Sequence, residues 1–458
     1  MTWVTRQTCL DSMTVHQTDR QIFRLAIPAF FALVAEPLFL LTDTAIVGRL
    51  GTPELAGVGI AAVVMQTAVG LCVFLAYGTT AGVSRHLGAG DARRALALGA
   101  DGIWLAVGLG VLLTTVLLTV TGPLVDAFGV GEAVAGHAQD YLVVALLGVT
   151  PLLVMLAATG VLRGLQDTRT PLWVAVGGNA VNVVLNLVLV FGYGPFPALG
   201  VAGSALGSVI AQVLSAAVLV AVVVRAARAE GASLAPDLPG IRDAGRASVP
   251  LVVRTLALRA ALVVGAWAVA SSGDPEGEAV AAHQVAFTIW TFLVFALDAI
   301  AIAAQTLTGH ALGAGDRDRT RELTRRMIRW GWASGVVAGL VLAASSPWLG
   351  PLFSQDPAVH ELLVPILLVA ALSQPMAGVV FVLDGVLIGA GDGRFLAWAG
   401  VWTLVAYVPP VLAVPLLVTQ AQSLLWIWIL FSGLFMGVRC AVLLHRARGE
   451  RWMVLGAS

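Results

Sequence analysis

Two acidic side chains lie inside the first long apolar stretch of the chain. This stretch runs from Leu25 to Gly48 and contains Glu36 and Asp43. An acid near the middle of a bilayer costs about 2.5–3.5 kcal/mol to insert. The two residues are seven positions apart, or two helical turns, so we expect both to point to the same side. The pair predicts a site that binds a proton or a cation, although two structural acids satisfied by neighbouring helices are an alternative.

Three asparagines share one face of a later apolar stretch. Asn179, Asn182 and Asn186 follow an i, i+3, i+7 spacing. Amides between helices can be packing contacts worth about 0.6–2 kcal/mol each, or they can line a wet pocket. Burial disfavours the charged form of a carboxyl group, so a buried aspartate can bind and release a proton near neutral pH. We therefore predict an ion-coupling site made of Asp43, Glu36 and the three asparagines.

The second half of the chain carries arginines in its first apolar stretch. Arg254 and Arg259 lie there, and a buried arginine needs an anion, for which Asp298 is the natural candidate. The pattern favours a structural ion pair over direct contact with a substrate. Asp384 stands as a lone acid that can face a cavity as a second cation or proton site. The residues expected to line a substrate cavity are Asp298, Asp384, Arg259, Gln305 and Gln284.

These residues must be positioned by membrane-spanning helices. The chain has 458 residues, of which 59% are hydrophobic and 11% charged, whereas soluble domains carry roughly 25% charged residues. The apolar runs predict an all-α protein with twelve transmembrane helices. Their approximate bounds are 25–48, 55–82, 96–121, 138–162, 172–193, 201–224, 247–271, 279–308, 327–349, 360–389, 395–418 and 422–445.

Charge and cysteine content restrict the partners. The net charge is zero and no basic patch indicates nucleic acid. Cys9, Cys72 and Cys440 are far apart, so neither a disulfide framework nor a metal site is implied, and we expect no cofactor. We expect small organic substrates, the lipid bilayer as the surrounding medium, and a monomer.

Arginines alternate along the predicted connections. Loops on one side hold most of them, whereas the other side holds Arg49 alone among the loop arginines. Under the positive-inside rule, both termini and the central link are expected to be cytoplasmic. We expect a multi-pass protein of the bacterial inner membrane.

An internal repeat divides the chain. The sequence Leu-Gly-Ala-Gly-Asp at 87–91 recurs at 312–316, an offset of 225 residues, and Pro28 matches Pro250 at an offset of 222. Two halves with six spans each have the same orientation, as in transporters that rock two lobes about a midplane site. The expected organisation is an N-terminal tail, an N-lobe, a link, a C-lobe and a C-terminal tail, at 1–20, 21–224, 225–246, 247–445 and 446–458.

Several stretches together resemble the DinF-like branch of the MATE (multidrug and toxic compound extrusion) family. They are AEPLFLLTDTAIVGRLG at 35–51, GVLRGLQDTRTPL at 160–172, GVAGSALGSVIAQ at 200–212, ALD at 296–298 and the two GAGD turns. The resemblance covers nearly the whole chain. It implies two six-helix lobes around a central cavity and export of organic, often cationic, compounds by antiport against protons or sodium.

The resemblance also implies roles for particular residues. The acid that matches Asp43 is the coupling residue of the family's first lobe, and its partners lie on the fifth span. This chain has Asn186 at a position that can be an aspartate, and Phe39 where a tyrosine occurs in some members. The coupling ion, proton or sodium, therefore stays open.

Three other functions are less well supported by the residues. A flippase for lipid-linked precursors of the same superfamily would favour a cavity rich in arginine, and only Arg254 and Arg259 could serve. An intramembrane enzyme would need a nucleophile with its base, a metal-binding motif or paired aspartates, and none is present. A passive channel fits poorly with two rocking lobes. We therefore predict a secondary active exporter that is not an enzyme.

Overall fold

The protein consists of helices that cross the membrane twelve times. The computed structural model describes residues 15–273 and 277–457, and every regular element in these two segments is a helix. Twelve stretches in them are long and apolar enough to span a bilayer, which confirms the predicted number and fold class. Each observed span overlaps one predicted run, and most are longer than predicted.

Each half of the chain contributes six spans. Those of the first half are α1 (Val15–Val47), α2 (Thr52–Leu71) with α3 (Phe74–Gly88), α4 (Ala92–Asp126), α5 (Glu132–Ala145) with η2 (Leu146–Gly148) and α6 (Val149–Gly164), α7 (Arg169–Phe191) and α8 (Gly200–Ala229). Those of the second half are α9 (Leu238–Ala270), α10 (Glu278–Gly313), α11 (Arg317–Phe353), α12 (Pro357–Gly389), α13 (Gly393–Leu417), and α14 (Gln420–Ile429) with η3 (Leu430–Phe435) and α15 (Met436–Arg448).

The central link is more helical than its polar composition suggests. Segment 225–246 lies in α8 as far as Ala229 and in α9 from Leu238 onward. Asp237 caps α9, since its carboxylate accepts a hydrogen bond from the backbone N–H of Gly240 at 3.2 Å. A capping aspartate followed by proline within the first turn is a helix-start signal, and it explains why α9 begins before its apolar residues do.

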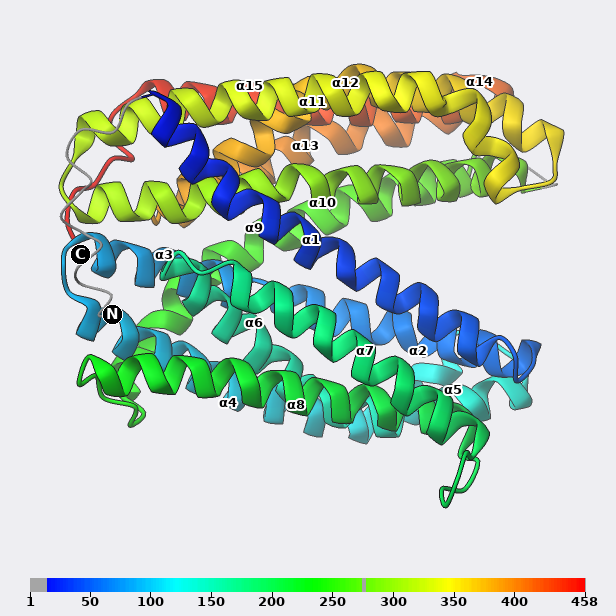
Figure 1. Cartoon of the computed structure of the whole chain (residues 1–458). Coiled ribbons are helices and arrows are strands. Elements are labelled where there is room, and N and C mark those ends of the chain that lie inside the picture. Colours follow the sequence, from blue (N-terminus) through cyan, green and yellow to red (C-terminus); the bar gives the residue numbers. More distant parts are fainter. Residues whose placement is uncertain (1–14, 274–276, 458) are drawn as a thin grey trace.

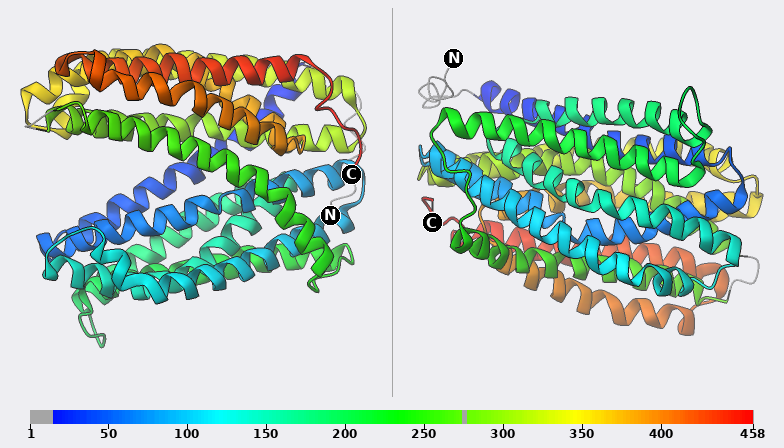
Figure 2. Two further views of the ribbon diagram at one scale, coloured as in Figure 1. Left: turned by 180° about the vertical axis from the view of Figure 1, so that it is seen from behind. Right: turned by 90° about the horizontal axis from the view of Figure 1, so that it is seen from below.

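The helices form two bundles that meet at one end and separate at the other (Figures 1 and 2). One bundle contains α2 to α8 and the other α10 to α15, so each follows one half of the chain. We call them the N-bundle and the C-bundle. This is the arrangement expected of two parallel repeats.

Helix α1 connects the two bundles. Near its start, Asp19 accepts hydrogen bonds from the guanidinium of Arg326 and, at 2.8 Å, from the indole N–H of Trp330, both on α11. Farther along, Ala29 packs against Ala299 of α10, and the later part of α1 reaches α7 (Figure 1). Its repeat counterpart α9 packs mainly on α13 and also touches α3 and α4. Each half of the chain therefore contributes one helix, α1 or α9, that packs against both bundles.

The bundles touch where α3 lies along α10. A Cβ atom at Gly88 would lie 2.0 Å from the carbonyl oxygen of His310, and one at Gly313 would lie 1.9 Å from that of Arg85. Glycine at these positions allows the two backbones to pack in direct contact, as small residues do between membrane helices. We call this contact the α3–α10 seam.

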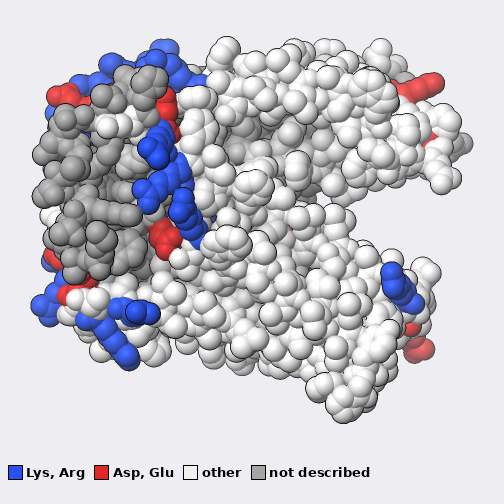
Figure 3. Space-filling model, viewed as in Figure 1, with Lys and Arg blue, Asp and Glu red and all other residues white. Residues whose placement is uncertain are grey.

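Charged side chains gather at the end where the bundles meet. In Figure 3 this end carries most of the visible arginines, and the surface between the bundles is hollowed at the opposite end. Both ends of the described chain lie near the arginine-rich end (Figure 1). The structure is thus closed on its arginine-rich side and open on the other.

Candidate functional site

Asp43 lies in a buried polar cluster inside the N-bundle. Its side chain is 5% exposed although it is on an apolar helix. Its Oδ1 accepts hydrogen bonds from the amide of Asn186 at 2.7 Å and from the hydroxyl of Ser204 at 2.5 Å. Its Oδ2 accepts a longer one, 3.5 Å, from the hydroxyl of Tyr141. Helices α1, α5, α7 and α8 therefore converge on a single carboxylate.

Two of the asparagines predicted to share one helix face, Asn182 and Asn186 on α7, extend this cluster away from Asp43. The Nδ2 of Asn186 also donates to Oδ1 of Asn182 at 3.1 Å, and Asn182 donates to the hydroxyl of Ser208 at 3.0 Å. Asn182 and Asn186 are 2% and 0% exposed. Of the three predicted asparagines, Asn186 thus contacts Asp43 directly, and Asn182 is connected to Asp43 through Asn186.

Small residues on α8 allow α7, the helix that carries Asn182 and Asn186, to pack closely against α8. A Cβ atom at Gly207 would lie 2.2 Å from Oδ1 of Asn186, and one at Gly203 would lie 2.5 Å from the carbonyl oxygen of Leu189. The Gly-x-x-x-Gly spacing places both glycines on the face of α8 that meets α7. Ser204 follows Gly203 directly, so the same close approach brings its hydroxyl to Asp43.

Every contact to Asp43 comes from a hydrogen-bond donor. The Asn186 amide, the Ser204 hydroxyl and the Tyr141 hydroxyl all donate, which is the pattern that an ionised carboxylate accepts. Oδ1 of Asn186 is buried and has no hydrogen-bond partner among the described residues. If Asp43 takes up a proton, it becomes a donor and needs an acceptor, so at least one of these hydroxyl or amide groups must reorient.

Asn179 and Glu36 lie outside this direct network. Asn179 donates from Nδ2 to the backbone carbonyl of Ala35 at 2.8 Å and thereby ties α7 to α1. Glu36 is exposed and forms no hydrogen bond or ion pair within residues 15–273 and 277–457. It lies seven positions before Asp43 in the same unbroken helix, so it occupies the same face but not the buried cluster.

The C-bundle has a second buried cluster, built around Asp384. Oδ2 of Asp384 accepts hydrogen bonds from Arg254 on α9 at 2.8 Å and from Arg439 on α15 at 2.5 Å. The exposed fractions of the three residues are 3%, 8% and 5%. Asp384 is therefore not the lone acid that its sequence context suggested. Arg439 was not among the predicted site residues, although an arginine within an apolar span signals a buried anion.

The expected ion pair between Arg259 and Asp298 is wrong. Arg259 is exposed, and its guanidinium reaches toward Gly70 on α2 instead. Asp298 is half-buried on α10 and interacts electrostatically with Arg163 of the N-bundle and with Arg254. Arg259 lies five positions after Arg254 on the same helix, and this interval rotates the second arginine away from the bundle interior.

The two remaining residues that were predicted to line a substrate cavity, Gln305 and Gln284, lie in different surroundings. Gln305 is 2% exposed and donates to the backbone carbonyl of Tyr77 at 2.6 Å, so it joins α10 to α3. It lines a small pocket with Asp298, Asp384 and Arg254. Gln284 is exposed near the start of α10 and does not belong to that pocket.

The repeat places no acid opposite Asp43 in the C-bundle. At the offset of 222 residues Asp43 corresponds to Gly265, and at 225 Asn182 corresponds to Tyr407. These two counterparts are neighbours, since a Cβ atom at Gly265 would lie 3.1 Å from the Tyr407 hydroxyl. The fold is duplicated, whereas the buried carboxylate of α1 is not.

Comparisons with known proteins agree with this architecture. The MatE family model matches residues 28–188 and 250–411, one block in each half. The chain is 30% identical over 397 residues to the chloroplastic Protein DETOXIFICATION 44 of Arabidopsis thaliana, covering 83% of this chain and 73% of the relative. It is 28% identical over 394 residues to DNA damage-inducible protein F of Escherichia coli, covering 84% and 83%.

A solved structure shows the same fold. The outward-facing conformation of a multidrug resistance MATE family transporter of the MOP superfamily superposes with a TM-score of 0.84 at 21% identity, covering 94% of this chain and 95% of the other. Members of the matched family are membrane transporters and not enzymes. The twelve-span, two-bundle chain described above belongs to the MATE family of transporters.

Proposed function

We propose that this protein exports small organic compounds across a bacterial inner membrane in exchange for protons, and that Asp43 carries the proton. The observation that supports this most strongly is the burial of one carboxylate among three donors from three other helices. The relatives of this chain include probable multidrug resistance proteins named NorM and plant proteins named DETOXIFICATION. These names support organic compounds as substrates.

The donor set favours a proton over sodium as the coupling ion. A sodium ion would need several oxygen ligands around it, whereas only two side-chain oxygens among the described residues, the hydroxyls of Ser204 and Tyr141, hydrogen-bond to Asp43. The described part of the chain also holds no group of three or more acidic, histidine or cysteine side chains that could bind a metal ion. Protonation removes the charge and leaves the donors without an acceptor of equal strength.

In the proposed cycle the proton changes the helix arrangement around Asp43. A proton that enters from the open side neutralises Asp43, which weakens its bonds to α7 and α8. The bundle then rearranges, the compound leaves to that side, and the bundles rock to expose the opposite side, where the proton is released. A potential of 100 mV contributes about 2.3 kcal/mol per proton, enough for roughly a fifty-fold gradient of a neutral solute.

The arginine distribution supports an orientation. The arginine-rich, closed end (Figure 3) carries both ends of the described chain (Figure 1). Under the positive-inside rule that end is cytoplasmic, so both termini are cytoplasmic and the open side faces outward. The coupling cluster lies within a single chain, which fits a protein that works as a monomer.

The cavity favours amphipathic or cationic compounds over lipid pyrophosphates. Glu36 is exposed on the Asp43 face of α1 and has no partner among the described residues, so it can attract a cation. A flippase for lipid-linked precursors would need a cavity rich in free arginines, but of the two predicted candidates Arg254 is paired with Asp384 and only Arg259 stays outside an ion pair among the described residues. This pairing argues against the flippase.

Transport in reconstituted vesicles tests the proposal. The wild type and Asp43→Asn would be reconstituted in lipid vesicles, and ethidium movement followed under an imposed proton gradient or an imposed sodium gradient. We expect proton-driven transport by the wild type, no response to sodium, and no coupled transport by the variant. Sodium-driven transport, or full proton coupling in Asp43→Asn, would contradict the proposal.

A further inference from the structure

Arg85 crosses from one bundle to the other at the closed end. It lies in the last turn of α3 and is 8% exposed. Its guanidinium donates to the backbone carbonyls of Ala390 at 3.0 Å, Val454 at 2.5 Å and Gly456 at 2.9 and 3.3 Å. Within the described segments Arg85 has no acidic partner. Every acceptor belongs to the second half of the chain.

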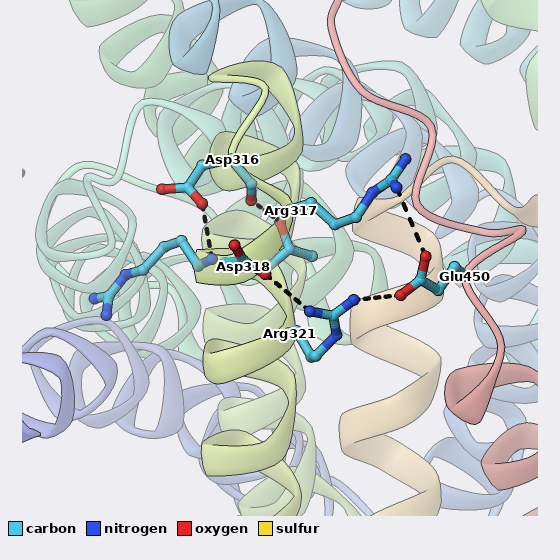
Figure 4. Close-up of polar contacts among 7 residues, drawn as sticks. Asp316, Arg317, Asp318, Arg321 and Glu450 are labelled. Carbon is cyan, nitrogen blue, oxygen red and sulfur yellow. Dashed lines mark hydrogen bonds and ion pairs between the residues drawn. The ribbon is translucent and has the colours of Figure 1, made fainter.

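Two of these acceptors lie in the segment that follows α15, which we call the C-terminal strap (Gly449–Ala457). Figure 4 shows one end of the strap held on α11: the carboxylate of Glu450 pairs with Arg317 at 3.6 Å and with Arg321. The strap is thereby tied to the C-bundle by charge, beyond its covalent link to α15.

Apolar burial and a backbone hydrogen bond hold the rest of the strap. Trp452 and Met453 are 1% and 5% exposed and belong to the main hydrophobic cluster. The backbone N–H of Gly456 donates to the carbonyl of Leu312, at the end of α10, at 2.9 Å. The strap is therefore a fixed part of the C-bundle, and Arg85 is the N-bundle side chain that enters it.

The strap sits at the end of the α3–α10 seam. The backbone of Arg85 is itself in contact with Gly313 across that seam. If the bundles separate at the arginine-rich end, α3 must leave α10, and Arg85 must leave Ala390 and the strap. Hydrogen bonds from a charged group are stronger than neutral ones, and breaking them leaves the buried carbonyl of Ala390 unpaired until water enters.

We propose that Arg85 and the C-terminal strap form a latch that holds the arginine-rich side closed, so that their separation is required for the protein to open inward. This inference rests on the alternating access of the proposed function. Arg85 is a positioning residue here, because it sets the balance between the outward-open and inward-open arrangements and does not touch the substrate or Asp43.

The distance between the bundles at the closed end reports this balance directly. Spin labels at Arg93→Cys and Ala314→Cys, in a chain whose three native cysteines are replaced by alanine, would lie on opposite bundles at exposed positions. Double electron–electron resonance on the purified full chain in lipid nanodiscs, without substrate or gradient, measures the distribution of that distance.

Two variants weaken the latch in independent ways. Arg85→Ala removes the donor. Deletion of residues 454–458 removes three of the four hydrogen bonds to Arg85 while Glu450, Trp452 and Met453 stay in place. We expect each to raise the ratio of long to short distances by about tenfold or more. Arg451→Ala is the matched control, because Arg451 is an exposed strap arginine outside the latch, and it should leave the distribution unchanged.

The outcomes separate this inference from the proposed function. If both the deletion and Arg85→Ala keep the wild-type distance distribution, the latch does not exist. If Arg85→Ala does not yield folded protein, the deletion decides alone, since it leaves the bundle helices intact. Shifted distances together with unaltered proton coupling in Asp43→Asn would support the latch and reject the proton-carrying role of Asp43.

Discussion

The carboxylate of Asp43 on α1 accepts a 2.5 Å hydrogen bond from the hydroxyl of Ser204 on α8, 161 positions later in the chain. Both side chains are buried, at 5% and 0% exposure. This contact makes α8 sensitive to the charge on α1, because a hydrogen bond to a carboxylate is roughly twice as strong as one to a neutral group.

Replacement of Ser204 by alanine is expected to slow transport strongly without unfolding the protein. A hydrogen bond to a charged group contributes about 1.5–3 kcal/mol, so Ser204→Ala should lower the initial rate of proton-driven transport by about ten-fold or more. Ser215→Ala is the control, because Ser215 is a buried serine on the same helix that forms no hydrogen bond with Asp43, Asn182 or Asn186. Equal rates in both variants and the wild type would show that the Ser204 contact has no part in coupling.

The glycine at position 207 is expected to be required for the position of Asn186. Because a Cβ atom there would lie 2.2 Å from Oδ1 of Asn186, Gly207→Ala must displace the amide. We expect overpacking to cost about 1–3 kcal/mol of stability. We also expect transport to fall to a similar extent in Gly207→Ala and in Asn186→Ala. Thermal unfolding in detergent and vesicle transport measure the two effects. Gly59→Ala, on a face with nothing within 4 Å, should change neither.

The Asp384 cluster is expected to stabilise the C-bundle and not to carry the coupling ion. Asp384→Asn would leave the buried guanidinium groups of Arg254 and Arg439 without their anion, which should cost about 3–5 kcal/mol. Thermal unfolding of the purified protein checks this value. Glu322→Gln, which breaks an exposed ion pair with Arg319, should stay within about 0.5 kcal/mol of the wild type. Unchanged stability in Asp384→Asn would refute a structural role for the cluster.

Local sequence signals predicted the fold well, because each span carries its own apolar run and the bilayer fixes its minimum length. The internal repeat could be recognised from two turns of identical sequence, at 87–91 and 312–316, each of which lies at the end of a span. The start of α9 was harder to predict, since its first turns are polar and are marked only by the Asp237 cap.

The candidate site was predictable only in part. Asp43 and Asn186 stand out because each is polar in an apolar run, and one helix face links Asn186 to Asn182. Ser204 and Tyr141 gave no such signal, since serine and tyrosine are common in membrane helices. Their role depends on how α5 and α8 pack against α1.

The arginine assignments failed for a related reason. Spacing along α9 could not tell which of Arg254 and Arg259 faces the bundle interior, because that depends on the rotation of the helix about its axis. The partner Asp384 is 130 positions away from Arg254 and comes close only when α9 and α12 are packed. Pairings of this kind are determined by tertiary structure.

The most direct test of the account follows proton movement and substrate movement in the same vesicles. A pH-sensitive dye trapped inside would report protons that enter while ethidium is exported by the wild type and by Asp43→Asn. We predict that substrate-dependent proton entry disappears in the variant, while folding and ethidium binding persist. Proton entry that continues at the wild-type rate in Asp43→Asn would contradict the assignment of the proton to Asp43.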